Sequence, residues 1–291
     1  MRKRGRAVAG AAAVLLAASP APGQHWLELS ASRQLDGVSR LEVDVEYAAG
    51  ELAVFPARAG RLYDYRVRYD ASKFRPQREW SLSKGVGRLS VSLDGHDGVE
   101  LDLDLRHLRG GSHEVGSLSL GLSREVPTYL DLTVGAAESS LELGGVPLTG
   151  LRYHTGASET RLRFDEPNPV RMDRLELAVG AASFHAEGLG NARFGSFVFE
   201  GGIGDVTLDF SGEWERSATA SLDMGVGSLH LRLPRHIGVR IRRSTFLTTF
   251  EAGGLEKDGD SYRTANWETA EHRLDIDLDA TFGTIEIDFV R

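Results

Sequence analysis

The feature that most constrains the fold is a glycine-centred pattern that occurs five times between residues 130 and 233. In each copy apolar residues alternate with polar ones on both sides of one glycine, and successive glycines are 21, 24, 22 and 23 residues apart. Apolar residues two positions apart are typical of strands with one buried face. Each copy therefore predicts two short strands. The aligned glycines are Gly135, Gly156, Gly180, Gly202 and Gly225.

The columns of this repeat indicate which side chains face a core. The positions three before and six after the glycine are apolar in all five copies, whereas the position five after it is polar. We therefore expect each repeat to form a strand, a glycine turn, a second strand and a longer loop. Glycine is expected at the turn and again two residues later, as in Gly204 and Gly227, because residues with a Cβ resist the backbone angles required there.

The period of the repeat favours one architecture. A two-strand unit of about 22 residues cannot bury its apolar face alone, but stacked neighbours can. The sequence therefore predicts an all-β, β-solenoid-like stack of two-strand repeats that is irregular at both ends. The alternatives are a sandwich of antiparallel hairpins and an outer-membrane barrel. The barrel is disfavoured because the polar face is densely charged and no aromatic girdle recurs.

The flanking regions carry the same pattern in a looser form. Copies begin near Gly50, Gly85 and Gly116, and the last copy places Gly283 in line with Gly227. Atypical terminal units are expected in repeat proteins, where they start and cap the stack. The predicted organisation is a signal peptide over residues 1–23, an N-terminal β region over residues 24–126 and the repeat domain over residues 127–291.

The first 23 residues have the composition of a secretory signal peptide. A basic start precedes the apolar run Ala7–Ala18, and Ala21-Pro22-Gly23 supplies small residues for cleavage before Gln24. The apolar run is too short to span a bilayer. We therefore expect an exported protein, periplasmic or extracellular, without a transmembrane anchor in its mature chain. The sequence contains no cysteine, so neither a disulfide nor a lipid-modified cysteine can form.

Charge narrows the classes of partner. The formal net charge is −8, and it becomes −12 when the four basic residues of the signal peptide are removed. An acidic surface argues against nucleic acids and anionic membranes as partners. An envelope protein or a cell-wall polysaccharide is the partner expected.

A glycine-rich turn resembles two known binding motifs without matching either. In Gly201–Asp205 the aspartate comes one residue too early for a calcium-binding β-roll, and the motif does not repeat every nine residues. It also lacks the third glycine and the helix of a dinucleotide-binding fingerprint. We interpret it as a structural turn and predict no cofactor.

Carboxylates at alternate positions near the C-terminus offer oxygen ligands that a divalent cation prefers. The interpretation favoured is the solvated face of an edge strand, where charge discourages unwanted pairing. Asp102 and Asp104 present the same two alternatives. The C-terminal residues are Asp275, Asp277, Asp279, Glu286 and Asp288.

Histidines and aromatic residues provide the remaining candidates. His185 and His230 fall in one column two repeats apart, about 9.6 Å in a stack, which is too far for both to bind one metal ion. Trp214, Tyr262 and Trp267 could bind sugar rings or a protein, but we expect them to cover the open end of the stack.

Nothing in the sequence identifies a catalytic centre. No Gly-x-Ser-x-Gly elbow is present, and the polar column mixes serine, arginine, histidine and threonine without a pattern. We therefore predict no catalytic, cofactor-binding or metal-binding residues. The function expected is that of an envelope-associated binding, adhesin-like or scaffold domain. The alternative is a carbohydrate-active enzyme on a β-helix scaffold.

Two stretches carry a family resemblance. The run Gly225–Ile241, closed by Phe282–Ile287, resembles the C-terminal β domain of LiaF-type cell-envelope stress proteins. The glycine-turn repeats before it resemble the related toast-rack and adhesin-type domains of bacterial envelope proteins. The resemblance covers roughly residues 126–291, and the N-terminal part is similar to toast-rack starting modules. It implies a non-catalytic β-solenoid-like domain exposed outside the membrane or linked to envelope stress. LiaF itself has transmembrane helices, which this chain does not share.

Overall fold

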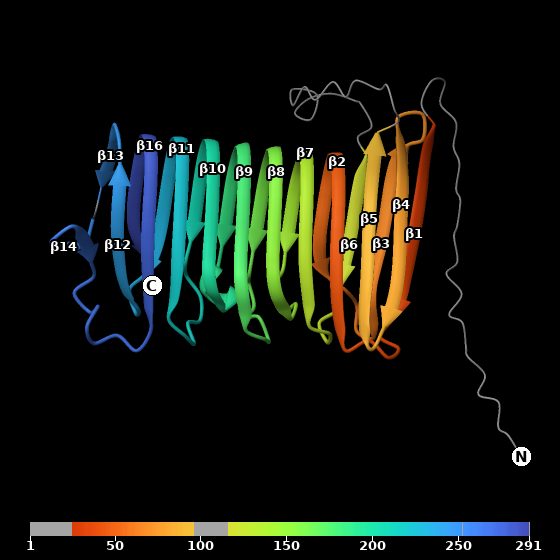
Figure 1. Ribbon diagram of the computed structural model, residues 1–291, viewed down its shortest axis with the longest axis horizontal. Helices are drawn as coiled ribbons and strands as arrows, with labels where there is room; N and C mark the ends of the chain where they lie inside the picture. The colour runs from red at the N-terminus through yellow and green to blue at the C-terminus, as the bar shows by residue number, and fades with distance from the viewer. Residues whose placement is uncertain (1–24, 96–115, 252, 291) are drawn as a thin grey trace, which may run out of the picture.

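Long bent strands form the body of the molecule. The computed structural model describes residues 25–95, 116–251 and 253–290, so the predicted signal peptide, Asp102 and Asp104 lie outside the described residues. In Figure 1 each long strand ascends the front layer, bends at the top and descends the back layer. These strands are β2 (Arg40–Pro56), β7 (Thr128–Glu142), β8 (Leu148–Arg163), β9 (Met172–Glu187), β10 (Phe194–Asp209), β11 (Ala218–Pro234) and β16 (Arg273–Val290).

The predicted strand–turn–strand unit is therefore one continuous strand. Pairing between β9 and β10 joins Val179 to Gly201 before the bend and Ala181 to Ile203 after it. Each corner stacks directly on the corner of the neighbouring strand, so the strand ladder continues through the bend.

Neighbouring repeats pair in parallel and in register. The order β2-β7-β8-β9-β10-β11-β16 runs through the middle of a single sheet, and the predicted glycine columns align across it. The stacked, solenoid-like prediction is confirmed, and the alternative of antiparallel hairpins is wrong for the repeats. Loops at the bottom of the stack return the chain to the front layer (Figure 1).

The first glycine column exists for a different reason from the one expected. The backbone angle φ is positive at Gly204 (149°) and Gly227 (136°), as predicted for the second column, but not at Gly180 or Gly202 in the first. A Cβ at Gly202 would lie 2.3 Å from the carbonyl oxygen of Gly180 in the preceding strand. Close approach of two backbones, rather than an unusual backbone angle, selects glycine in the first column.

At the C-terminal end the chain leaves the stack and returns inside it. After β11 it forms β12 (Gly238–Thr245) and β13 (Thr248–Glu251), followed by the short strands β14 (Glu256–Asp258) and β15 (Ser261–Arg263). Strand β16 then pairs with β11 on one side, and on its other side with β12 along its first arm and with β13 along its second arm. The last strand in sequence is therefore an inner strand in space.

At the N-terminal end the strands between β2 and β7 cover the outer side of β2. Strands β5 (Val86–Gly95) and β6 (Ser117–Leu122) pair with its two arms. Three antiparallel pairings extend the sheet further outward. Strand β4 (Phe74–Ser83) pairs with the outer edge of β5, β3 (Arg61–Asp70) pairs with that of β6, and β1 (Trp26–Gln34) pairs with that of β3. Because β2 also pairs with β7, one sheet crosses the predicted boundary at residue 126.

A single hydrophobic core fills the space between the two layers. Aromatic rings are stacked along it, such as Phe184 and Phe199, whose centroids are 5.7 Å apart. Among the described residues the helical element is a short 3-10 turn, Leu189–Ala192. Within the described ranges, no helix has the length and apolar character needed to cross a membrane.

One part of this core is polar, which explains an irregularity in the repeat. The position four after the glycine is apolar in three copies but is Ser139 or Thr160 in the other two. The hydroxyl of Tyr153 crosses from the front layer and lies 3.0 Å from Ser139 Oγ and 2.8 Å from Thr160 Oγ1. Buried hydroxyls require such partners.

Candidate functional site: a polar groove on the front layer

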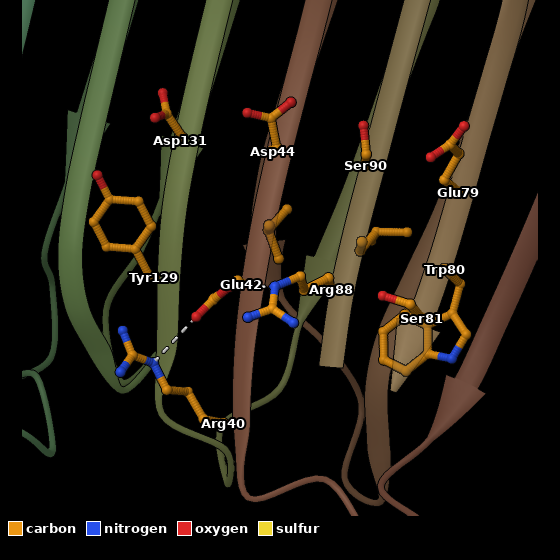
Figure 2. Close-up of a pocket in the computed structure, with 12 residues that line it drawn as sticks. Arg40, Glu42, Asp44, Glu79, Trp80, Ser81, Arg88, Ser90, Tyr129 and Asp131 are labelled. Atoms are coloured by element: carbon orange, nitrogen blue, oxygen red, sulfur yellow. Dashed lines mark ion pairs between the residues drawn. The ribbon is translucent and has the colours of Figure 1, made fainter. Parts of the chain in front are cut away.

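A groove of about 640 Å³ lies on the outer face of the front layer, where β4, β5, β2 and β7 are adjacent (Figure 2). These strands are part of one hydrogen-bonded sheet, so the side chains that border the groove project from a rigid support. Ten of the residues that line it are labelled in Figure 2, and most of them form two rows across the strands, with Arg40 below the lower row.

The upper row presents mainly acceptors. The sheet register places Asp131, Asp44 and Ser90 side by side on β7, β2 and β5, and Glu79 of β4 pairs with Ser90. Neighbouring strands are about 4.8 Å apart, so four oxygen-bearing side chains face solvent in one line. This row could accept hydrogen bonds from a ligand rich in donors.

The electrostatics of this row centre on Asp44. Burial, and secondarily the negative charge of Asp131, raise the pKa of Asp44 above its ordinary value. Asp131 has a cationic neighbour, since Arg152 Nη1 lies 3.1 Å from its Oδ2. Among the residues that the structure describes, no cation pairs with Asp44. A donor from a ligand would therefore relieve an unfavourable charge at Asp44.

The lower row supplies donors and one aromatic ring. Arg88 Nε lies 2.8 Å from Glu42 Oε2, and Arg40 Nε lies 3.9 Å from Glu42 Oε1. The ring of Tyr129 lies against Gly150 on β8, where a Cβ would approach the ring to 2.8 Å. Glycine on the neighbouring strand thus lets the tyrosine ring lie along the sheet.

Trp80 also lines the groove, but its ring is engaged elsewhere. The ring packs 5.6 Å from the ring of Tyr63, centroid to centroid, and the guanidinium of Arg33 lies 4.3 Å above it. Trp80 therefore helps to close the N-terminal end of the core. Tyr129 is the aromatic residue of the groove that remains at the sheet surface.

Such a set of groups suits a hydroxyl-rich ligand. Carboxylates accept hydrogen bonds from hydroxyls, arginines donate to ring and hydroxyl oxygens, and an aromatic ring packs against the apolar face of a sugar. Most of the side chains labelled in Figure 2 are polar or charged.

Comparison with known families identifies the chain. Residues 23–173 and 168–232 match the family described as the N-terminal domain of toast_rack, DUF2154, and these spans exceed half of the chain. The chain belongs to the toast-rack family. The match ends before β12, so the resemblance of the C-terminal part to LiaF-type proteins stays a prediction. A search of curated proteins found no match to this toast-rack chain.

Three solved structures are similar to parts of this chain at low sequence identity. A candidate cell adhesion protein from Clostridium sporogenes is 16% identical with a TM-score of 0.49, over 90% of this chain and 99% of that one. A candidate adhesin from Bacteroides fragilis is 9% identical with a TM-score of 0.30, over 90% and 97%. One from Parabacteroides distasonis is 9% identical with a TM-score of 0.26, over the same shares. At these TM-scores the likeness transfers no function to the toast-rack chain.

Most of the C-terminal carboxylates face solvent, as expected, but the expectation of an edge strand is wrong for residues 275–286. Strand β16 is internal because β12 and β13 pair with its outer side. Two arginines of β12 occupy the space next to the carboxylates: Arg240 hydrogen-bonds Asp275, and Arg242 hydrogen-bonds both Asp275 and Asp277. Burial alone would raise the pKa of Asp275, but these hydrogen bonds outweigh it and hold the pKa below its ordinary value.

The other predicted residues are dispersed through the toast-rack fold. His185 and His230 lie in one column, two strands apart, because Thr207 pairs with both. His230 Nε2 instead lies 2.9 Å from Asp288 Oδ2. Asp205 of the glycine-rich turn accepts a hydrogen bond from Ser228. In the described part of the chain, no group of three or more histidine and carboxylate side chains could hold a metal ion.

The aromatic residues expected at the open end divide into two groups. Trp214 lies in a bottom loop in the middle of the stack, where its ring packs 5.7 Å from that of Phe194, so capping is wrong for it. Tyr262 lies at the C-terminal end against Phe250, at 5.0 Å. Trp267 lies beneath the guanidinium of Arg240, at 4.7 Å.

The groove itself was missed by sequence reasoning. One local signal was available, because Asp44 and Asp131 each stand four residues before the corner position, at Ala48 and Gly135. Strands β4 and β5 lack a recognisable alignment with that column. Ser90 joins the row through the non-local pairing of β5 with β2, and Glu79 follows because β4 and β5 form a hairpin.

Proposed function

We propose that this protein is an exported, non-catalytic binding protein of the cell envelope that holds a carbohydrate chain in the groove of Figure 2. The observation that carries the proposal is the upper row of oxygen acceptors, in which Asp44 has no cationic partner among the described residues, beside Arg40, Arg88 and the ring of Tyr129. The acidic composition and the toast-rack family membership agree with a surface role.

Binding of soluble sugars tests this proposal directly. Peptidoglycan fragments and neutral oligosaccharides are titrated into the full chain by isothermal calorimetry. We expect Tyr129→Ala and Arg88→Ala to weaken binding on the order of tenfold, because each removes a direct ligand contact. Glu138→Gln, an exposed change on the same strand β7 but on its back arm, is the matched control and keeps the affinity unchanged. Equal affinity in all variants, or no sugar bound, would sink the proposal.

Export is tested separately. When the chain is expressed in a bacterial host, N-terminal sequencing of the protein recovered outside the cytoplasm is expected to begin at Gln24, because small residues precede that position. An intact N-terminus and purely cytoplasmic recovery would contradict export.

One observation favours the second candidate function, a carbohydrate-active enzyme. Asp44 and Asp131 lie side by side, and a carboxyl with a raised pKa next to a second carboxylate is the pairing that glycosidases use. Release of reducing ends from a polysaccharide panel measures it. Turnover that is abolished by Asp44→Asn would replace the binding proposal, whereas binding without turnover supports the binding proposal.

A further inference from the structure

A second surface with an unusual composition lies at the top of the stack. Strands β10, β11 and β16 each expose one large apolar side chain at their corner: Ile203 (64% exposed), Val226 (44%) and Phe282 (43%). The register places the three side by side. The turn between β12 and β13 extends the line with Phe246 and Leu247, both largely exposed, and the ring of Phe246 packs 6.0 Å from that of Phe282. We call these five residues the apolar crest.

The apolar crest is not required by the fold. The same corner position holds Ala136 in β7 and Ala157 in β8. A strand can therefore bend at this position with a small residue there. Large exposed apolar groups that lie in one contiguous line mark interaction surfaces on soluble proteins. Five of them along one ridge therefore indicate a docking surface.

A line of carboxylates runs parallel to the apolar crest. Glu200, Asp223 and Asp279 are neighbours in the register, each three residues before a crest residue, and all three are exposed. Like charges directly opposite each other destabilise a sheet. Within the described ranges no cation pairs with any of the three, although Asp275 and Asp277 of the same β16 have arginine partners. We call these three residues the carboxylate row.

A shallow hollow of about 500 Å³ adjoins one end of the two lines. It runs across β7, β8, β9 and β10 as far as β11, and Glu200 and Asp223 border it. Its floor includes Gly180 and Gly202 of the first glycine column, which have no side chains to fill it. An extended segment could therefore enter from the hollow and continue across β10, β11 and β16, with the carboxylate row on one side and the apolar crest on the other.

We infer that the apolar crest and the carboxylate row form a docking site for an extended protein segment in which lysine or arginine alternates with apolar residues. Side chains of an extended chain point alternately to opposite sides. The basic side chains would then face the carboxylate row and the apolar ones the crest. The carboxylate row specifies this occupant, since it repels an anionic membrane and would face its own charge in a second copy packed row to row.

The test uses the full chain and three synthetic peptides, read out by fluorescence anisotropy. One peptide alternates lysine with valine, one glutamate with valine, and one lysine with serine. We expect the lysine–valine peptide to bind best, with an affinity that falls as salt is added. Equal binding of the glutamate–valine peptide, or no binding of the lysine–valine peptide, would overturn the inference.

Variants separate the two lines of the site. The triple change Glu200→Gln, Asp223→Asn and Asp279→Asn is expected to weaken binding of the lysine–valine peptide on the order of tenfold. It should also remove most of the salt dependence of that binding. The double change Ile203→Ser and Val226→Ser is expected to weaken binding of the same peptide to a similar extent, while the salt dependence of binding remains. The double change Glu51→Gln and Glu138→Gln is the matched control, because those carboxylates lie at corners where the crest position is alanine.

Two further measurements distinguish other occupants. Flotation with anionic or zwitterionic vesicles, or concentration-dependent self-association in analytical ultracentrifugation, would overturn the inference if the change of Ile203 and Val226 to serine abolished it. All crest and row positions altered are exposed, so thermal melts are expected to match the unaltered chain. The sugar-binding groove lies on the N-terminal strands, and its variants are expected to leave peptide binding unchanged, so the two proposals can fail independently.

Discussion

The corners of β7 and β8 differ from those of β10, β11 and β16, although all follow one sequence pattern. In β7 the chain turns with Ala136 and Ala137 both buried, and neither has a positive φ. In β11 the residue at the second position is Gly227, with φ of 136°, and Val226 before it faces solvent. A positive φ at that glycine thus accompanies an outward corner residue. One repeat therefore makes two surfaces, a closed corner and an exposed crest.

The two parts also differ in how their carboxylates are matched. Near the N-terminal end Asp44 lies beside Asp131 and its pKa is raised, whereas near the C-terminal end Asp275 lies between arginines and its pKa is lowered. A stacked sheet places equivalent residues of neighbouring strands side by side. Charged residues in such a column are therefore either balanced by opposite charges or left without compensation. The columns with uncompensated carboxylates are those that we assign to ligands.

The largest effect is expected from Gly227→Ala. A Cβ there would lie 1.9 Å from the carbonyl oxygen of Gly204, and the backbone angle is one that alanine resists. We expect the free energy of unfolding to fall by at least about 2 kcal/mol, measured by urea denaturation. Ala137→Gly in β7 is the matched change at the closed corner, and it should cost about 1 kcal/mol or less. Similar losses in both variants would mean that the two corners do not differ as described.

The second effect concerns the space at the two corners. Ala136 is only 3% exposed, so Ala136→Ile overpacks the core and should lower the free energy of unfolding by about 1–3 kcal/mol. The reverse change at the crest, Ile203→Ala, should stay within about 0.5 kcal/mol because that side chain faces solvent. Thermal and urea melts compare them. A tolerated isoleucine at residue 136 would remove the distinction between closed and exposed corners.

The third effect comes from the polar network beneath the closed corners. Tyr153→Phe removes the hydroxyl that contacts Ser139 and Thr160, leaving buried hydroxyls with fewer partners. The free energy of unfolding should fall by about 1–3 kcal/mol. The paired variant Tyr153→Phe with Ser139→Ala and Thr160→Val should recover part of that loss. A loss that remains in full would show that the network is not its cause.

The smallest effects are the pH dependences, which should have opposite signs. A raised folded-state pKa means that ionised Asp44 opposes folding, so its unfavourable contribution appears as pH rises through that pKa. Asp44→Asn should therefore stabilise the protein near neutral pH and lose this advantage in acid. A lowered pKa means that Asp275 contributes stability above its unfolded value, and this contribution is lost as pH falls through the folded pKa. Asp275→Asn should destabilise near neutral pH and converge with the unaltered chain in acid. Melts across acidic pH measure both, and equal signs would contradict the contrast.

The sequence by itself determined the strands, their stacking and the glycine columns, because each follows from a local period that many repeats share. It also located the columns that hold His185 and His230, and the alignment of Gly283 with Gly227, since register preserves such spacing. These features depend on residues a fixed distance apart in one chain segment.

Only the tertiary structure decided which strands became neighbours at the two ends. The insertion of β16 between β11 and β12, and the pairing of β5 with β2, join segments far apart in sequence. The repeat pattern marks β5 and β16 as copies but does not specify which strands they lie between. The insertion places Asp275 beside two arginines, and the pairing completes the groove around Asp44. The alternation of apolar and polar residues indicates which face of a strand is buried. Which strand pairs beside it depends on competition among all the strand edges that are available.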